Sequence, residues 1–177
     1  MDKELVVFVG GPGSGKSTLI EALREKGFVC YPEISRQVIL EAQKQGIEQL
    51  FLENPLLFSE LLMKGRVEQY QQASSENEKF VFLDRGIPDV LAYLDYTGFS
   101  YPNIFVDTCE QCVYDKIFVF EPWRDIYEND NERYESYEQS VLIHDYLERK
   151  YQSLGYQLIT VPKGNIEERI EFVLNNL

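Results

Sequence analysis

A glycine-rich stretch near the N-terminus constrains the fold of this chain more than any other feature. The stretch VVFVGGPGSGKSTLIEAL, Val6–Leu23, runs from an apolar segment through a glycine loop into a helical pattern. It satisfies the spacing G-x-x-x-x-G-K-[ST]. The matching residues are Gly10, Gly15, Lys16 and Ser17. A strand that leads through such a loop into a helix predicts a βαβ unit, in which helices cover a parallel sheet.

Apolar runs alternate with helical patterns along the rest of the chain, which favours an α/β fold with a parallel sheet covered on both faces. The predicted strands are Leu5–Val9, Phe28–Tyr31, Phe80–Leu83, Lys116–Phe120 and Tyr156–Val161. The predicted helices are Lys16–Lys26, Glu33–Lys44, Pro55–Ser74, Asp89–Tyr96, Asn103–Cys112, Glu135–Leu154 and Ile166–Asn176, with Asn54 as the N-cap before Pro55. We expect the 177 residues to form one domain, 1–177.

The composition limits the partners that the chain can have. It contains 17 Lys and Arg against 30 Asp and Glu, for a net charge of −13. Nucleic-acid binding draws its affinity from Lys and Arg on phosphates, so we expect no nucleic-acid partner. No window approaches the ~18 consecutive apolar residues of a membrane span, so we expect no membrane partner, and the apolar stretch near the N-terminus is too short for a signal segment. The number of cysteines, three, is odd, which suits a reducing compartment, so we expect a cytoplasmic protein.

The glycine loop has the chemistry to hold a nucleoside triphosphate. Its glycines permit positive φ and let backbone N–H groups approach an oxyanion at a helix N-terminus. The Lys16 ammonium can reach the β- and γ-phosphates, and the Ser17 hydroxyl can bind Mg²⁺. The expected triphosphate-binding residues are Gly11, Pro12, Gly13, Ser14, Gly15, Lys16, Ser17 and Thr18. The loop alone does not name a reaction, because many kinds of nucleotide-binding protein share it.

An acidic residue ends the third predicted strand, in KFVFLDRG. Asp84 can position Mg²⁺ together with Ser17, although a capping Asp at a strand end is the alternative. Arg85 follows at the place where a regulatory hydrolase usually has the Glu that activates water, which argues against efficient ATP hydrolysis. The sequence also has neither the N-K-x-D element of GTPases nor the L-S-G-G-Q signature of transporter ATPases. The pattern therefore favours a small-molecule kinase.

Two further segments fit that interpretation. The polar stretch Glu121–Ser136, between the fourth strand and a long helix, is predicted to be a lid, whose Arg124 and Arg133 can neutralise charge on the transferred phosphoryl group. The alternative is that these arginines pair with nearby acids on the surface. Glu33 and Arg36 follow the second strand, where Glu33 can accept the proton of a substrate hydroxyl or hold that hydroxyl, unless it merely begins a helix.

Four motifs together carry a resemblance to a known family. GGPGSGKSTLIEAL, YPEISRQVI, FLDRGIPDVLAYL and PWRDIYENDNERYESYEQ, in this order, resemble the P-loop ATPase and kinase family that includes the ribosylnicotinamide kinase domain of NadR-type proteins. The chain is more distantly similar to thymidylate and deoxynucleoside kinases. The resemblance implies a three-layer α/β/α fold with a five-stranded parallel sheet of order 2-3-1-4-5, a lid after the fourth strand, and ATP and Mg²⁺ as cofactors.

The resemblance also implies roles for single residues. The implied catalytic residues are Lys16, Glu33, Asp84, Arg85, Arg124 and Arg133. The implied acceptor-binding residues are Glu33, Arg36 and Asp89, and the implied metal ligands are Ser17 and Asp84. The leading hypothesis is a Mg²⁺-dependent kinase that transfers the γ-phosphate of ATP to a hydroxyl of a small, nucleoside-like metabolite. The alternative is an ATP-dependent switch or regulatory ATPase whose nucleotide-bound state a protein partner recognises. The acidic stretch Asp125–Glu138 would then bind that partner.

Overall fold

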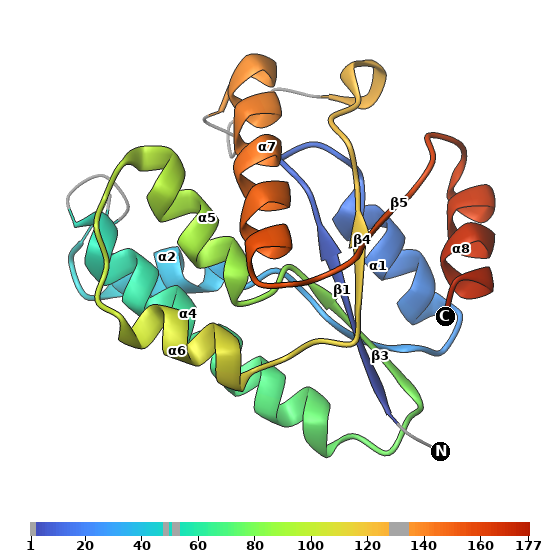
Figure 1. Cartoon of the computed structure of the whole chain (residues 1–177), viewed down its shortest axis with the longest axis horizontal. Helices are drawn as coiled ribbons and strands as arrows, with labels where there is room; N and C mark the ends of the chain where they lie inside the picture. Colours follow the sequence, from blue (N-terminus) through green and yellow to red (C-terminus); the bar gives the residue numbers. More distant parts are fainter. Residues whose placement is uncertain (1–2, 48–49, 51–53, 128–134) are drawn as a thin grey trace.

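The computed structural model describes residues 3–47, 50, 54–127 and 135–177. Its sheet has five parallel strands in the order β2-β3-β1-β4-β5 (Figure 1). The strands are β1 Glu4–Val9, β2 Val29–Tyr31, β3 Phe80–Asp84, β4 Lys116–Val119 and β5 Leu158–Thr160. The predicted strand order and the α/β P-loop fold are confirmed, and each strand overlaps its predicted segment.

The helices also lie where the sequence patterns place them. They are α1 Lys16–Glu25, α2 Ser35–Lys44, α4 Pro55–Ser75, α5 Pro88–Thr97, α6 Ile104–Gln111, α7 Tyr137–Ser153 and α8 Ile166–Asn175, with a short 3₁₀ helix η1 at Arg124–Ile126. The predicted cap of α4 is confirmed, since the Asn54 side chain accepts a hydrogen bond from the Leu57 N–H. Among the helices that the structure describes, none has the length and apolarity to cross a bilayer.

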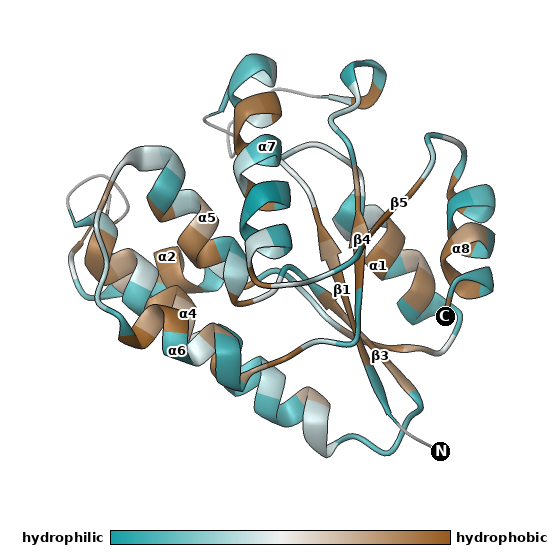
Figure 2. Ribbon diagram, viewed as in Figure 1, coloured by the Kyte–Doolittle hydropathy of each residue, from teal (hydrophilic) through white to brown (hydrophobic). Residues whose placement is uncertain are grey.

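Helices pack on both faces of the sheet, because successive strand residues point to opposite sides. In β1, Val6 and Phe8 face α1 and α8, whereas Leu5, Val7 and Val9 face the layer that contains α4, α5, α6 and α7. The hydropathy colouring in Figure 2 shows the central strands as apolar along most of their length. A strand buried on both faces requires such a continuous apolar run, which explains why β1 is apolar at every position from Leu5 to Val9.

Aromatic packing fills the core on the α1 and α8 side. The Phe8 ring lies 5.7 Å from the Phe82 ring, 6.0 Å from Phe118 and 4.8 Å from Phe120, measured between centroids. All four side chains are fully buried. Rings at such distances contribute beyond the area that they bury, so β1, β3 and β4 are joined by side chains as well as by backbone hydrogen bonds.

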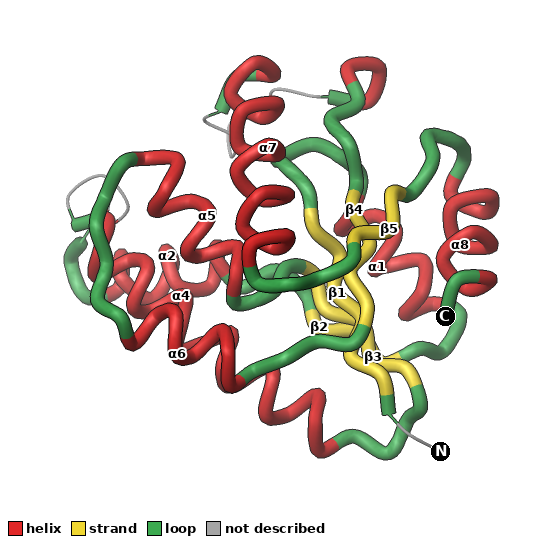
Figure 3. The backbone as a smooth tube through the Cα atoms, in the orientation of Figure 1, coloured by secondary structure: helices red, strands yellow, loops and turns green. Residues whose placement is uncertain are grey.

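The parallel arrangement brings the loops that follow the strands to one edge of the sheet (Figure 3). The glycine loop follows β1, Glu33 follows β2, and Arg85 follows β3. The predicted lid, residues 121–136, leaves β4 at the same edge. Residues 128–134, which include Arg133, lie outside the described residues.

Replacing Phe8 with Ala should lower the free energy of unfolding by about 3–5 kcal/mol, because the cavity would open between three other phenylalanine rings. Phe99→Ala is the matched control, since Phe99 is 46% exposed, and it should change stability by about 0.5 kcal/mol or less. Urea unfolding measures both values. Equal losses in the two variants would contradict the packing described for β1.

Candidate active site

The glycine loop contains glycines that no other residue could replace. Gly13 and Gly15 have φ values of +74° and +83°, in the left-handed region that other residues rarely adopt. A Cβ atom at Gly13 would lie 2.5 Å from the Tyr127 ring, and one at Gly15 would lie 2.7 Å from Nη1 of Arg169. The loop is thus held between the start of the lid and α8, and Gly15 is the N-cap of α1. Its backbone conformation suits the binding of an anion.

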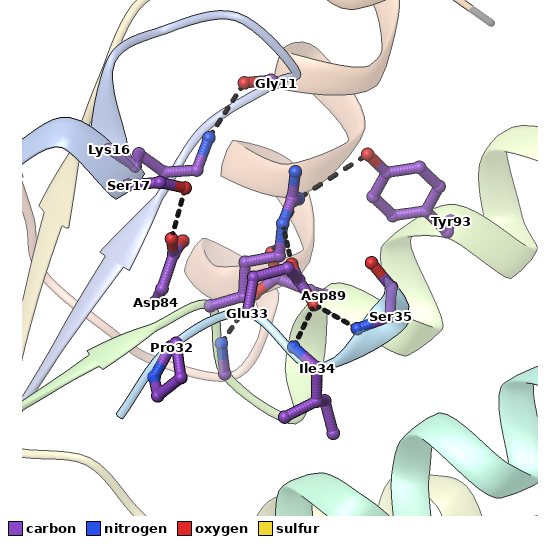
Figure 4. A network of polar contacts seen from close by, with 12 residues as sticks. Gly11, Lys16, Ser17, Pro32, Glu33, Ile34, Ser35, Asp84, Asp89 and Tyr93 are labelled. Atoms are coloured by element: carbon purple, nitrogen blue, oxygen red, sulfur yellow. Dashed lines mark hydrogen bonds and ion pairs between the residues drawn. The ribbon is translucent and has the colours of Figure 1, made fainter. Parts of the chain in front are cut away.

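Lys16 has its ammonium group buried against this loop. Its Nζ donates hydrogen bonds to the Gly11 carbonyl at 2.9 Å and to the Ser14 hydroxyl at 3.0 Å, and the side chain is 5% exposed. Figure 4 shows the bond to Gly11. Burial, followed by the charge of Arg85, lowers the pKa of Lys16 to about 7. A triphosphate fits this position, because an anion beside the ammonium would offset the cost of burying its charge.

Ser17 and Asp84 meet as the sequence predicts. The Ser17 hydroxyl donates to Oδ2 of Asp84 at 2.6 Å, although the two residues lie on α1 and β3 (Figure 4). Asp84 is 2% exposed, its Oδ1 has no hydrogen-bond partner among the described residues, and burial raises its pKa. A hydroxyl and a carboxylate oxygen are the ligand types that Mg²⁺ prefers. The pair therefore fits a magnesium ion whose remaining ligands are phosphate oxygens and water.

Glu33 is the centre of a network of charges. Its Oε1 accepts hydrogen bonds from the N–H groups of Ile34 and Ser35, both at 2.9 Å, and from Nη2 of Arg66 at 3.0 Å. Its Oε2 pairs with Nε of Arg85. Burial acts to raise the pKa of Glu33, but the charges of Arg66 and Arg85 outweigh burial and bring the pKa to about 2. Glu33 therefore stays ionised, and its role at the start of α2 coexists with its place in the site.

Arg66, on α4, is a site residue that the sequence analysis missed. It is 3% exposed, and its Nε and Nη1 have no hydrogen-bond partner among the described residues. A signal was present, because the buried residues of α4 recur at helical spacing and include one arginine. These residues are Ser59, Leu62, Met63, Arg66, Gln69 and Ala73. An arginine within such a stripe predicts a buried carboxylate partner, which Glu33 supplies.

Arg85 adopts an uncommon backbone conformation, with a φ of +74°. Its N–H donates to the Phe8 carbonyl at 3.0 Å, and Nη1 lies 3.4 Å from Oδ1 of Asp89 and 3.5 Å from the Tyr93 hydroxyl. A non-glycine residue persists in the left-handed region only where its surroundings hold it there. These contacts direct the Arg85 side chain toward Glu33.

Asp89, at the start of α5, holds the turn that carries Arg85. Its Oδ2 accepts hydrogen bonds from the Gly86 N–H at 3.0 Å and from the hydroxyl of Tyr151 at 2.6 Å, and Asp89 is 1% exposed. Tyr151 lies on α7, so the helix after the lid is joined to the turn that carries Asp84 and Arg85. The observed contacts give Asp89 a role in orienting Arg85, and its contact with substrate stays a prediction.

One cavity of about 700 Å³ connects these groups. Its lining includes the glycine loop from Pro12 to Thr18, and also Glu33, Arg36, Asp84, Arg85 and Asp89. Gly11 takes part through its carbonyl, which accepts from Lys16. Apolar walls complete the cavity with Ile39, Phe58, Leu62, Val90 and Tyr93. The residues predicted to bind the triphosphate and those predicted to bind the acceptor thus share one space.

The described part of the lid lies close to the glycine loop, but Arg124 points to the surface. Its side chain is 73% exposed, Nη1 lies 3.8 Å from Oε1 of Glu138, and the guanidinium lies 5.0 Å from the Tyr137 ring. This position matches the surface pairing that the sequence left open. A catalytic role for Arg124 stays a prediction, as does that of Arg133, which lies outside the described residues.

The family comparison agrees with this site. A model of a family described as an AAA domain matches residues 5–169. The chain belongs to this family. The match covers the glycine loop, Asp84, Arg85 and the predicted lid, and it confirms the family resemblance that the four motifs carry. No curated protein sequence shows significant similarity to this member of the family.

Solved structures share the fold of this family member. Deoxyadenosine kinase from M. mycoides, with dCMP and dCDP bound, superposes with a TM-score of 0.70 at 15% identity over 97% of each chain. NadR in complex with NR gives 0.72 at 18% identity over 98% of this chain and 49% of NadR. Thymidylate kinase from Ehrlichia chaffeensis gives 0.62 at 16% identity over 100% of each chain. At these identities the likeness establishes a P-loop kinase fold.

The charge network predicts how stability depends on pH. Glu33→Gln should lower the free energy of unfolding at pH 7 by on the order of 2 kcal/mol, because it leaves Arg66 buried without a carboxylate. A carboxyl with a lowered pKa contributes stability above its ordinary pKa, 4.5, and loses that contribution as the pH falls toward about 2. The difference in the free energy of unfolding between wild type and Glu33→Gln should therefore narrow as the pH falls from 4.5 toward about 2.

Urea unfolding at several pH values measures this difference. Glu21→Gln is the control, because the Glu21 side chain is 60% exposed and pairs with Arg24 on the surface. Its effect should stay small at every pH. A difference between wild type and Glu33→Gln that is constant from pH 7 to pH 2 would contradict the assignment of the charge network to Glu33.

Proposed function

We propose that this protein is a Mg²⁺-dependent kinase that transfers the γ-phosphate of ATP to a hydroxyl of a small, nucleoside-like metabolite. The observation that carries the proposal is the shared cavity, which joins the glycine loop and the Ser17–Asp84 pair to Glu33 and Arg85. Phosphoryl transfer depends mainly on positioning and on neutralising charge, and both kinds of group line this cavity.

The donor side of the site would be formed by the loop and by α1. Backbone N–H groups of the loop and the Lys16 ammonium would hold the β- and γ-phosphates. Ser17 and Asp84 would hold Mg²⁺, which when bound neutralises charge on the phosphate oxygens. Arg124 and Arg133 would approach the phosphates from the lid. We propose further that residues 1–177 form a single nucleotide-binding domain, and that the protein acts on small-molecule partners in the cytoplasm.

The acceptor side would be formed by Glu33, Arg36 and Arg85, with Asp89 holding Arg85 in place. An ionised Glu33 can accept a hydrogen bond from the substrate hydroxyl and so orient its oxygen toward the phosphate. A carboxylate with so low a pKa is a weak base, which is sufficient where the bond to the attacking oxygen is little formed in the transition state. The Arg85 guanidinium would stabilise the charge that develops between donor and acceptor.

The comparisons support a kinase with ATP as donor. The structural neighbours are named as deoxyadenosine kinase, thymidylate kinase and NadR, and one NadR structure contains AMP-PNP. Another structure of the deoxyadenosine kinase contains dATP. Arg85 supports transfer over hydrolysis, because it stands beside Asp84 and pairs with Glu33 instead of activating water.

Transfer of ³²P from [γ-³²P]ATP to a pool of small hydroxyl compounds, including nucleosides, nucleotides and sugars, tests the proposal. Wild-type protein with Mg²⁺ should label an organic product faster than it releases labelled phosphate to water. Asp84→Asn should reduce this transfer by about 100-fold, because it weakens the metal site. Asp107→Asn, at an exposed position of α6, is the control and should leave the rate unchanged. Labelled inorganic phosphate as the only product would contradict the kinase assignment.

A further inference from the structure

Arg169 is a buried arginine that contacts the glycine loop, although it is not among the described residues that line the cavity. It occupies the fourth position of α8, and it is 6% exposed. Its Nη2 donates a hydrogen bond to the Ser14 carbonyl at 3.1 Å, across 155 positions of sequence. Its Nη1 lies 2.7 Å from the place that a Cβ atom of Gly15 would occupy. The guanidinium therefore lies against the peptide group that joins Ser14 to Gly15.

No carboxylate among the described residues pairs with Arg169, in contrast to Arg66 and Arg85, which share Glu33. Glu168, its neighbour on α8, accepts instead from a backbone N–H at the start of that helix. Burial lowers the pKa of Arg169. Burial also acts to lower the pKa of Arg66, but the charge of Glu33 outweighs it. Arg169 is thus a buried cation whose charge no acid in the described structure neutralises.

The other surroundings of Arg169 compensate its charge only in part. Its guanidinium lies 5.0 Å from the Phe120 ring and 5.7 Å from the Trp123 ring, and ring faces attract a cation less strongly than a carboxylate does. Its Nε has no hydrogen-bond partner among the described residues. The N-terminal end of a helix carries partial positive charge, which disfavours a cation near the start of α8. Burying such a group costs free energy that these contacts do not return in full.

We infer that Arg169 is a positioning residue of the donor site, which strengthens the hold of the glycine loop on a phosphate chain through the Ser14–Gly15 peptide group. This inference rests on the proposed function and adds a residue to its donor side. The C=O and N–H groups of a trans peptide point in opposite directions, so the Gly15 N–H points away from Arg169. A charged hydrogen bond to the carbonyl polarises the peptide group and makes its N–H a stronger donor to an anion.

Two cations contact Ser14 from different elements. Lys16 donates to the Ser14 hydroxyl at 3.0 Å, and Arg169 donates to the Ser14 carbonyl. A triphosphate in the loop would contact Lys16 directly, whereas the charge of Arg169 would act on it across the peptide group. In a partly buried site such a charge still attracts an anion over several ångströms. The bound triphosphate would therefore supply the negative charge that Arg169 lacks in the free protein, which is why a costly buried cation is expected beside a functional site.

Calorimetric titration of the full chain with AMP-PNP and Mg²⁺ tests this inference. Arg169→Met removes the charge but keeps a long side chain, and it should weaken the affinity about 10-fold. Arg169→Lys keeps the charge and should weaken the affinity by about 3-fold or less. Arg149→Met, whose arginine is 71% exposed on α7, is the control and should leave the affinity unchanged. An Arg169→Met affinity equal to that of wild type or of Arg169→Lys would overturn the inference alone. Wild type that does not bind AMP-PNP would overturn the proposed function as well.

Inorganic tripolyphosphate separates an effect on phosphates from a contact with the base, because it has neither base nor sugar. It should compete with AMP-PNP for wild type, and Arg169→Met should weaken its affinity by the same factor as that of AMP-PNP. A loss confined to AMP-PNP, or tripolyphosphate that does not compete, would overturn the role given to the peptide group.

Urea unfolding without ligand separates the same role from a purely structural one. The midpoint for Arg169→Met should equal or exceed that of wild type, because the variant removes a buried charge that has no acidic partner. A lower midpoint would show that the fold itself requires this charge and would overturn the inference.

Discussion

The parallel pairing of β1 with both β3 and β4 is the constraint on which the site depends. It sets Phe8 opposite Asp84 on one side and opposite Phe118 on the other, so the ends of the three strands coincide. The residues that follow them must then meet at one edge of the sheet. This is why Ser17, which opens α1, reaches Asp84 across 67 positions of sequence. The aromatic contacts of Phe8 make that register costly to change.

The second determinant is electrostatic and centres on Glu33. One carboxylate compensates two guanidiniums that come from α4 and from the turn after β3, so three separate segments are fixed relative to one another. Asp89 and Tyr151 extend this network to α7, the helix that follows the lid. A second contact, from the Ser140 hydroxyl to the Pro12 carbonyl at 2.8 Å, joins α7 to the glycine loop. Through α7 the glycine loop and the turn that carries Arg85 are held at a defined separation.

The sequence predicted those parts of the site that depend on local rules. The glycine loop requires particular residues at fixed spacing, and the strand ends at Asp84 and Glu33 follow from apolar runs, so both could be recognised without a structure. The spacing of Arg66 on α4 indicates burial, but its partner could not be identified from the sequence, because Glu33 is 33 residues away. The left-handed backbone of Arg85 could not be predicted either, because contacts with Phe8, Asp89 and Tyr93, which form only in the folded chain, hold it. The lid has no hydrophobic period, so the sequence could suggest its place after β4 but not the direction of its arginines.

The proposed function depends on Lys16, Ser17 and Asp84 holding a magnesium-bound triphosphate, and calorimetric titration with AMP-PNP tests this most directly. We predict binding that Mg²⁺ strengthens, with the Mg²⁺ effect reduced about 10-fold in Ser17→Ala and retained in Ser75→Ala, at the end of α4. Affinity that is the same with and without Mg²⁺, or no binding at all, would contradict the claim.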